Sequence, residues 1–249
     1  MIKTKTIQPL IYILLFIGSF FAATQTLPPN FEFVSTWASV VLALPSFVAL
    51  IQLFGRKKGV LIILLLGLFA LFIENFAILT GFPYGNFYYL NQLGFKIGAV
   101  PWTVAFTWTP LLFGCLGFAR LLLKKYKPLN IFAFVLLTCF LMVTTDLVLD
   151  PGAVALDFWR WQSPGFYYGV PLINFFGWIV SSLLGTLLFL FLENTFLYRK
   201  ISLTLLNSWK YSLVFWIGVS LWEQLWIPFV LGICFLSVIT LKIHHHIVD

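Results

Sequence analysis

Four acidic side chains stand in places where a hydrocarbon environment would make a charge costly. Glu74, Asp146, Asp150 and Glu223 lie within long apolar runs or at their ends. An unpaired carboxylate at membrane depth costs several kcal/mol, so acids at that depth usually serve a function. Carboxyl groups that burial keeps neutral can act as general acids. The four residues are therefore candidate proton donors or acceptors in catalysis.

The spacing of two of these acids predicts that they act together. Asp146 and Asp150 stand at positions i and i+4 of one apolar run, which places them on one face of a helix. Few basic residues fall at this depth to neutralise them. The alternative is a purely structural role, in which each acid forms a hydrogen bond with Asn75, Asn174 or a tyrosine hydroxyl.

The composition places these acids in a membrane protein. Of 249 residues, 61% are hydrophobic and 9% are charged, whereas a soluble domain has about 25% charged residues. The bilayer must therefore be the main solvent, and residues 1–249 are predicted to form a single integral membrane domain. The net charge of +7 does not indicate nucleic acid binding, because the charges form short clusters between apolar runs.

The apolar runs predict an all-α, polytopic bundle of about eight transmembrane helices. The first run follows Lys3 and Lys5 but lacks a clear cleavage site, so it is predicted to be a retained helix. A seven-helix alternative remains, in which 209–241 forms one bent helix instead of two helices that reverse near Glu223 and Gln224. The predicted spans are 8–26, 33–54, 59–79, 101–122, 130–149, 171–192, 203–222 and 226–242.

The basic residues predict the orientation, because Lys and Arg prefer cytoplasmic loops. With eight helices and a cytoplasmic N-terminus, all of the 15 Lys and Arg residues except Lys96 and Arg160 fall on the inside. We therefore expect a protein of the cytoplasmic membrane of a prokaryote. The residues predicted inside are Lys3, Lys5, Arg56, Lys57, Lys58, Arg120, Lys124, Lys125, Lys127, Arg199, Lys200, Lys210 and Lys242.

The predicted outside segments, 80–101 and 150–171, are long and rich in Gly, Pro and aromatic residues. An interfacial aromatic belt explains part of this, but the inner level has far fewer aromatics, which favours a lined pocket. Aromatic faces stabilise cations, including a carbocation. The aromatic residues near the outer level are Tyr84, Phe87, Tyr88, Tyr89, Trp102, Trp108, Trp159, Trp161, Tyr167, Tyr168 and Trp178.

Motifs for other chemistries are absent from the sequence. It contains no GxGxxG, P-loop or HExxH pattern. The three cysteines lie within apolar runs and have no metal-ligand spacing. We therefore expect neither a cofactor nor a metal. Buried acids beside an aromatic wall are suited to protonating an alkene.

Four segments together resemble a known family. They are ENFAILTGFPYGNFYY (74–89), KIGAVPW (96–102), DLVLDPG (146–152) and YYGVPLINFFGW (167–178). They are similar to the membrane carotenoid biosynthesis protein family, which includes carotenoid 1,2-hydratases of the bisanhydrobacterioruberin hydratase type. The likeness covers about residues 35–240. It implies a membrane enzyme that adds water to the terminal double bond of an acyclic carotenoid and forms a tertiary alcohol.

The residue roles are inferred from chemistry, since the resemblance supplies only the motif positions. Asp146 or Asp150 would donate the proton, and the other would orient water or take a proton back. Glu74 is the next candidate acid or base, followed by Glu223. Aromatic rings would flank the cation, an amide would hold water, and glycines would let the backbone approach the polyene. The expected substrate-binding residues are Tyr84, Gly81, Gly85, Tyr88, Pro101, Trp102, Trp108, Tyr167, Tyr168, Gly169, Pro171, Asn174 and Trp178.

The expected partners are a lycopene-like or longer acyclic carotenoid and membrane lipid. A carotenoid cyclase is an alternative, because it uses the same protonation before an internal alkene captures the cation. A polar water site near the acids would favour the hydratase. A second alternative is a non-enzymatic lipid-binding or transport protein. That function needs a polar path open to both sides, whereas the candidate acids all fall in the outer half.

Overall fold

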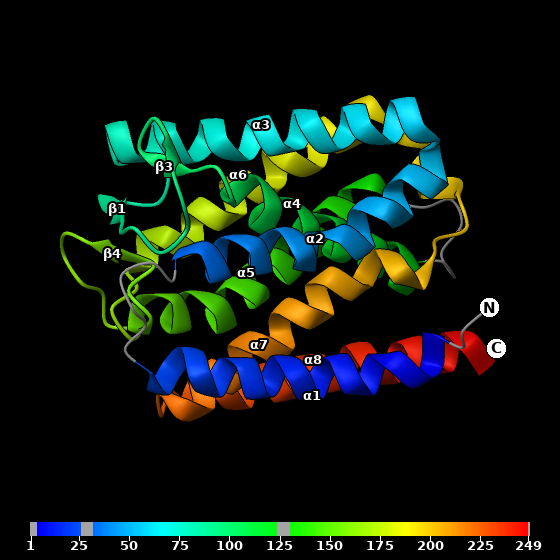
Figure 1. The fold of residues 1–249 in the computed structure, drawn as a ribbon. Helices are drawn as coiled ribbons and strands as arrows, with labels where there is room; N and C mark the ends of the chain where they lie inside the picture. The colour runs from blue at the N-terminus through cyan, green and yellow to red at the C-terminus, as the bar shows by residue number, and fades with distance from the viewer. Residues whose placement is uncertain (1–3, 26–31, 124–129, 249) are drawn as a thin grey trace.

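The computed structural model describes residues 4–25, 32–123 and 130–248 and shows an all-helical bundle (Figure 1). Long apolar sequences form helices here because a helix satisfies every backbone donor and acceptor within its own segment, as hydrocarbon requires. Over the described ranges, the α-helices are α1 (Thr4–Thr24), α2 (Glu32–Phe54), α3 (Arg56–Thr80), α4 (Val104–Leu122), α5 (Ile131–Ala155), α6 (Leu172–Leu192), α7 (Asn207–Trp222) and α8 (Trp226–Val248).

The structure confirms the prediction of about eight helices, including the division of 209–241 into α7 and α8. Gln224 has a positive φ of 57°, and the Leu225 N–H donates to the Ser220 carbonyl in the turn between the two helices. Seven of the helices are long and apolar enough to cross a membrane. The exception is α7, which has 16 residues. A 3₁₀ helix at Leu203–Leu206 comes directly before it. The predicted span 203–222 combines these two elements.

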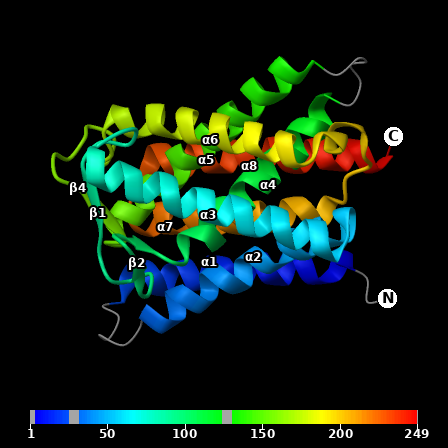
Figure 2. The same ribbon diagram turned by 90° about the horizontal axis from the view of Figure 1, so that it is seen from above.

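Successive helices run in alternating directions, so both ends of the described chain lie at one end of the bundle (Figures 1 and 2). We call this the basic end, because the loops and helix termini there carry Arg and Lys residues. Lys58 from α3 forms an ion pair of 2.5 Å with Glu193, which follows α6. Lys3, Lys124, Lys125 and Lys127 are outside the described residues, as is the side chain of Lys5. That the basic end faces the cytoplasm stays a prediction.

The opposite end, which we call the aromatic end, is closed by short strands. Strand β1 (Phe87–Tyr89) pairs antiparallel with β4 (Trp159–Trp161), and β2 (Lys96–Ile97) pairs with β3 (Val100–Pro101). The indole N–H of Trp161 also donates to the Tyr84 carbonyl at 2.9 Å. The β1–β4 ladder therefore joins two loops that are far apart in the sequence (Figure 1).

The centre of the bundle depends on close approach between helices. Helix α4 is largely buried and packs against α2, α3, α5 and α7. At Gly114 of α4, a Cβ atom would collide with Trp209 of α7, whose side chain is completely buried. The Trp209 indole N–H donates to the Thr145 hydroxyl of α5 at 2.8 Å. Small residues on α4 thus allow three helices to meet, as is common in membrane bundles.

This packing predicts that Gly114→Ala lowers stability. The added methyl group has no space beside Trp209 and should cost about 1–3 kcal/mol, which corresponds to several degrees in apparent unfolding temperature for a chain of about this size. Gly18→Ala in α1 is the matched control, because no described atom lies within 4 Å of a Cβ at that position. Thermal unfolding of the purified proteins in detergent measures both. Equal unfolding temperatures for the two variants would show that the close approach of Gly114 to Trp209 does not limit stability.

Candidate active site

The predicted acid pair meets at one amide group. The Asn174 side-chain nitrogen, from α6, donates to Asp146 Oδ2 at 2.9 Å and to Asp150 Oδ2 at 2.6 Å. Both acids belong to α5, and all three side chains are buried. One amide can serve both carboxyl groups because its two N–H bonds point in different directions. The hydrogen bonds to Asn174 fix both acids on the inner face of α5.

Glu74 of α3 has a partner that the sequence analysis placed in the aromatic cluster but not among the site residues. The Tyr89 hydroxyl donates to Glu74 Oε2 at 3.1 Å, and both side chains are buried. Burial first, and then the nearby charge of Glu74, raise the pKa of Tyr89 well above its ordinary value. Tyr89 therefore remains a neutral donor. It reaches Glu74 because β1 is paired with β4, where Tyr89 lies opposite Trp159.

A large cavity is lined by some of the buried acids and not by others. Its volume is about 1610 Å³, and its lining includes Asp150, Glu74 and Asn174. Asp146 is not part of the described lining. Pockets for drug-sized ligands measure roughly 300–1000 Å³, so this cavity can hold a larger molecule. Asp150 is the member of the pair that a molecule in the cavity would meet.

The cavity wall near the acids is aromatic. Trp108 of α4 and Trp178 of α6 are buried and line it. These two tryptophans follow the sequences Val100-Pro101 and Val170-Pro171 at the same spacing. Tyr84, Phe87, Trp159 and Trp161 complete the wall at the aromatic end.

Three buried polar atoms in this region have no hydrogen-bond partner among the described residues. They are the Tyr84 hydroxyl, Trp108 Nε1 and Asp146 Oδ1. Ser181 lies beside the Tyr84 hydroxyl, and burial followed by the charge of Glu74 raises the pKa of Tyr84 well above its ordinary value. A buried polar group without a partner is costly. These atoms therefore mark a place that suits a small polar molecule such as water.

Glu223, the fourth predicted acid, also lines the cavity but does not join the cluster around Asn174. It ends α7 at the aromatic end and is only partly buried. Burial raises its pKa above the ordinary value. No described group of three or more His, Cys, Asp or Glu side chains is arranged to hold a metal ion.

Tyr167 satisfies a backbone group near the acids. Pro151 lies inside α5 and has no N–H, so the carbonyl of Leu147, four residues earlier, lacks its usual helical donor. The Tyr167 hydroxyl donates to that carbonyl at 3.0 Å. This hydrogen bond therefore explains why Tyr167 lies near Asp146 and Asp150.

The other expected substrate-binding residues are outside the cavity lining and shape the cap or the helix ends. Three glycines with positive φ, Gly81, Gly85 and Gly169, form turns. A Cβ on Gly85 would lie 2.8 Å from Ile173 Cγ2 of α6. The remaining positions are Pro101 in β3, Trp102 stacked on Phe95, Tyr168 accepting from the Ile227 N–H, Pro171 at the start of α6, and Tyr88, which is 46% exposed.

These features define an integral membrane helix bundle with a buried carboxyl cluster beside an apolar, aromatic cavity. The family model for carotenoid biosynthesis proteins matches residues 32–239, and the chain belongs to that family. It is 33% identical over 197 residues to bisanhydrobacterioruberin hydratase from Haloarcula japonica. The match covers 78% of this chain and 66% of that relative, so the chain spans just under two thirds of its length. No solved structure matches the chain.

The shared amide predicts energetic coupling between Asn174 and Asp146. Asn174→Leu removes the donor of two buried carboxyl groups and should cost about 1–3 kcal/mol in stability. In an Asp146→Asn background the same change removes a weaker interaction, so the cost should fall by about 0.5 kcal/mol or more. Thermal unfolding of the four proteins of this double-mutant cycle measures the coupling. Additive effects would show that Asn174 is not energetically coupled to Asp146.

Proposed function

We propose that this protein is a carotenoid hydratase, which adds water across the terminal C=C bond of an acyclic carotenoid end group. The observation that carries the proposal is Asp150, a buried acid facing an apolar cavity with unpartnered polar atoms nearby. Family membership supports a carotenoid as the substrate. The relative's printed name supports the hydro-lyase reaction.

The first step is protonation of the alkene. The Asp150 carboxyl transfers its proton to the less substituted carbon of the double bond, and the π electrons form the new C–H bond. A tertiary carbocation results at the other carbon, while Asp150 becomes a carboxylate. The Asn174 N–H stabilises that carboxylate, and the faces of Trp108 and Trp178 stabilise the cation.

Water then completes the reaction. Its oxygen forms a C–O bond to the cation, and the resulting oxonium loses a proton to a carboxylate. Glu74 or Asp150 can accept that proton, and acceptance by Asp150 restores its starting state. The sum is the addition of one water molecule, with no change in total oxidation state. Asp146 supports Asp150 through the shared amide.

The polar atoms near Asp150 favour hydration over cyclisation. A cyclase must keep water away from the cation until an internal alkene reaches it. Here the Tyr84 hydroxyl and Trp108 Nε1 are buried beside the cavity without described partners, and Ser181 lies beside Tyr84. These groups can hold water next to the tertiary carbon.

The direct test is to express the chain in cells that accumulate an acyclic carotenoid such as lycopene and to analyse the pigments by mass. A gain equal to the mass of one or two water molecules supports the hydratase. An isomer of unchanged mass would establish cyclisation instead. Unaltered pigment from lycopene and from a longer acyclic carotenoid would contradict both enzymatic functions and favour a lipid-binding or transport protein.

Asp150→Asn should abolish most of the activity, because an amide cannot donate a proton to an alkene. General acids contribute about 10²- to 10⁴-fold to rate, so product formation should fall within that range. Asp146→Asn should have a smaller effect, since Asp146 does not line the cavity. Glu193→Gln at the basic end is the control and should keep normal activity. Equal activity of Asp150→Asn and the control would show that Asp150 is not the proton donor.

Tyr84→Phe should separate the two steps. Loss of one hydrogen bond to water, worth about 1 kcal/mol, should lower alcohol formation by several-fold to tenfold. Protonation by Asp150 should continue. In D₂O, reversible protonation would then place deuterium in recovered carotenoid, which mass spectrometry detects. A parallel loss of alcohol and deuterium incorporation would argue against a water-positioning role for Tyr84.

A further inference from the structure

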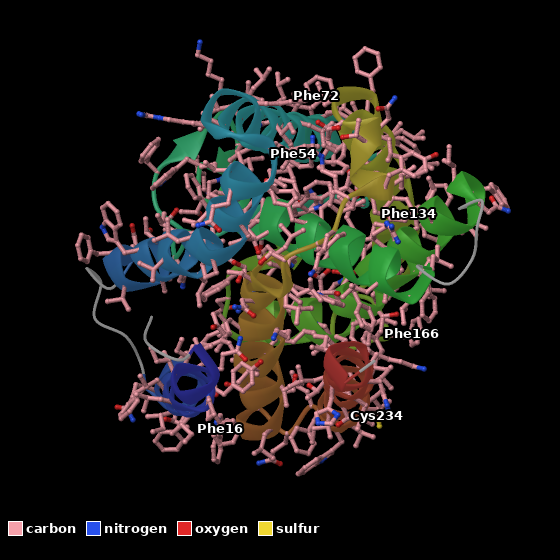
Figure 3. The ribbon with its side chains drawn as sticks, turned by 90° about the vertical axis from the view of Figure 1, so that its right-hand side faces the viewer. Phe16, Phe54, Phe72, Phe134, Phe166 and Cys234 are labelled. Atoms are coloured by element: carbon pink, nitrogen blue, oxygen red, sulfur yellow. The ribbon has the colours of Figure 1, made fainter. Side chains whose placement is uncertain are left out.

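Helix α1 is attached to the bundle along one face. It packs chiefly against α7, with Tyr12 against Tyr211 at 5.8 Å between ring centroids and Phe16 against Trp222 at 5.4 Å. Near the basic end, the Gln8 amide also donates to the Asn207 side chain at 3.1 Å. Figure 3 looks along the bundle from that end and shows α1 at its margin, beside α7.

Among the described residues, α1 and α2 are not closely packed against each other, although they follow one another in the chain. The cavity lies between them. Its lining includes Gly18 and Ala22 of α1 and Ala38 and Leu42 of α2, together with Phe215 of α7. A Cβ on Gly18 would meet no described atom within 4 Å. Small residues thus leave space where α1 faces α2.

The same cavity continues to Asp150 and Glu74. At the aromatic end, the β1–β4 ladder and its indole rings form part of the cavity wall. At the side, α1 and α2 carry exposed apolar residues such as Ile17 and Leu44, both 47% exposed, where bilayer lipid would surround them. The cavity therefore extends from the space between these two lipid-facing helices to the carboxyl cluster.

We propose that the space between α1 and α2 is the route by which a long polyene leaves the bilayer and reaches Asp150, and that the rest of the polyene stays there during the reaction. The chemical class of the ligand rests on the proposed function. A polyene is apolar along its length and dissolves in hydrocarbon, so access from within the membrane avoids transfer through water. Only its terminal double bond needs to reach the polar groups.

Gly18→Trp tests this route, because the indole would fill the space between the helices. Carotenoid hydration should fall by about tenfold or more. Ile17→Trp is the matched control, since Ile17 is adjacent in the sequence but does not line the cavity, and its activity should stay within about twofold. Ala38→Trp blocks the same space from α2, and Leu44→Trp is its control. Thermal unfolding of each variant shows whether it is folded.

A binding measurement keeps this test separate from the chemistry. Each protein is purified from carotenoid-producing membranes, and bound pigment is measured by its visible absorption per protein. Gly18→Trp and Ala38→Trp should retain several-fold less pigment than their controls, even if the pigment is never hydrated. Equal pigment binding or equal turnover in blocked and control variants would overturn the route. So would an unsubstituted protein that retains no pigment and hydrates none.

Discussion

The burial of three carboxyl groups in a hydrocarbon environment is the constraint on which this structure depends. Lipid offers no hydrogen bonds, so the protein must supply partners for Asp146, Asp150 and Glu74. Asn174 serves the first two and Tyr89 serves the third. Because these partners come from α6 and β1, the acids can be stable only when α3, α5, α6 and the β1–β4 ladder are assembled together. Because burying these carboxyl groups without partners would cost free energy, the stability of the site depends on the assembly of the whole aromatic end.

The aromatic end accordingly has two functions that cannot be separated. The β1–β4 ladder brings Tyr89 to Glu74, and the Trp161 indole holds the turn at Tyr84. The same rings form part of the cavity wall. Residues that look like an interfacial belt therefore determine both the hydrogen bonds of the acids and the shape of the space beside them.

Much of the fold could be predicted because helix ends in a membrane protein are marked by charge, Pro and Gly. The i and i+4 spacing of Asp146 and Asp150 correctly placed both on an inner face. The spacing alone could not show which of the two lines the cavity. Positions i and i+4 differ by about 40° around a helix, and the neighbouring helices fix how α5 is rotated about its axis. The role of Tyr89 was equally hidden, because strands of three residues are too short to show periodicity. The place of α1 depends on tertiary contacts with α7 that its largely apolar sequence does not predict.

The cavity extends from the space between α1 and α2 to Asp150 and Glu74 near the aromatic end. A linear molecule bound there would present one terminus to Asp150 and keep the other far from it. A symmetrical carotenoid with two reactive termini would consequently have to leave, reverse its direction and bind again before the second terminus could react. Under the proposed hydratase function, the position of the acids would make the reaction distributive, and a singly hydrated, unsymmetrical alcohol would be released into the membrane between the two hydrations.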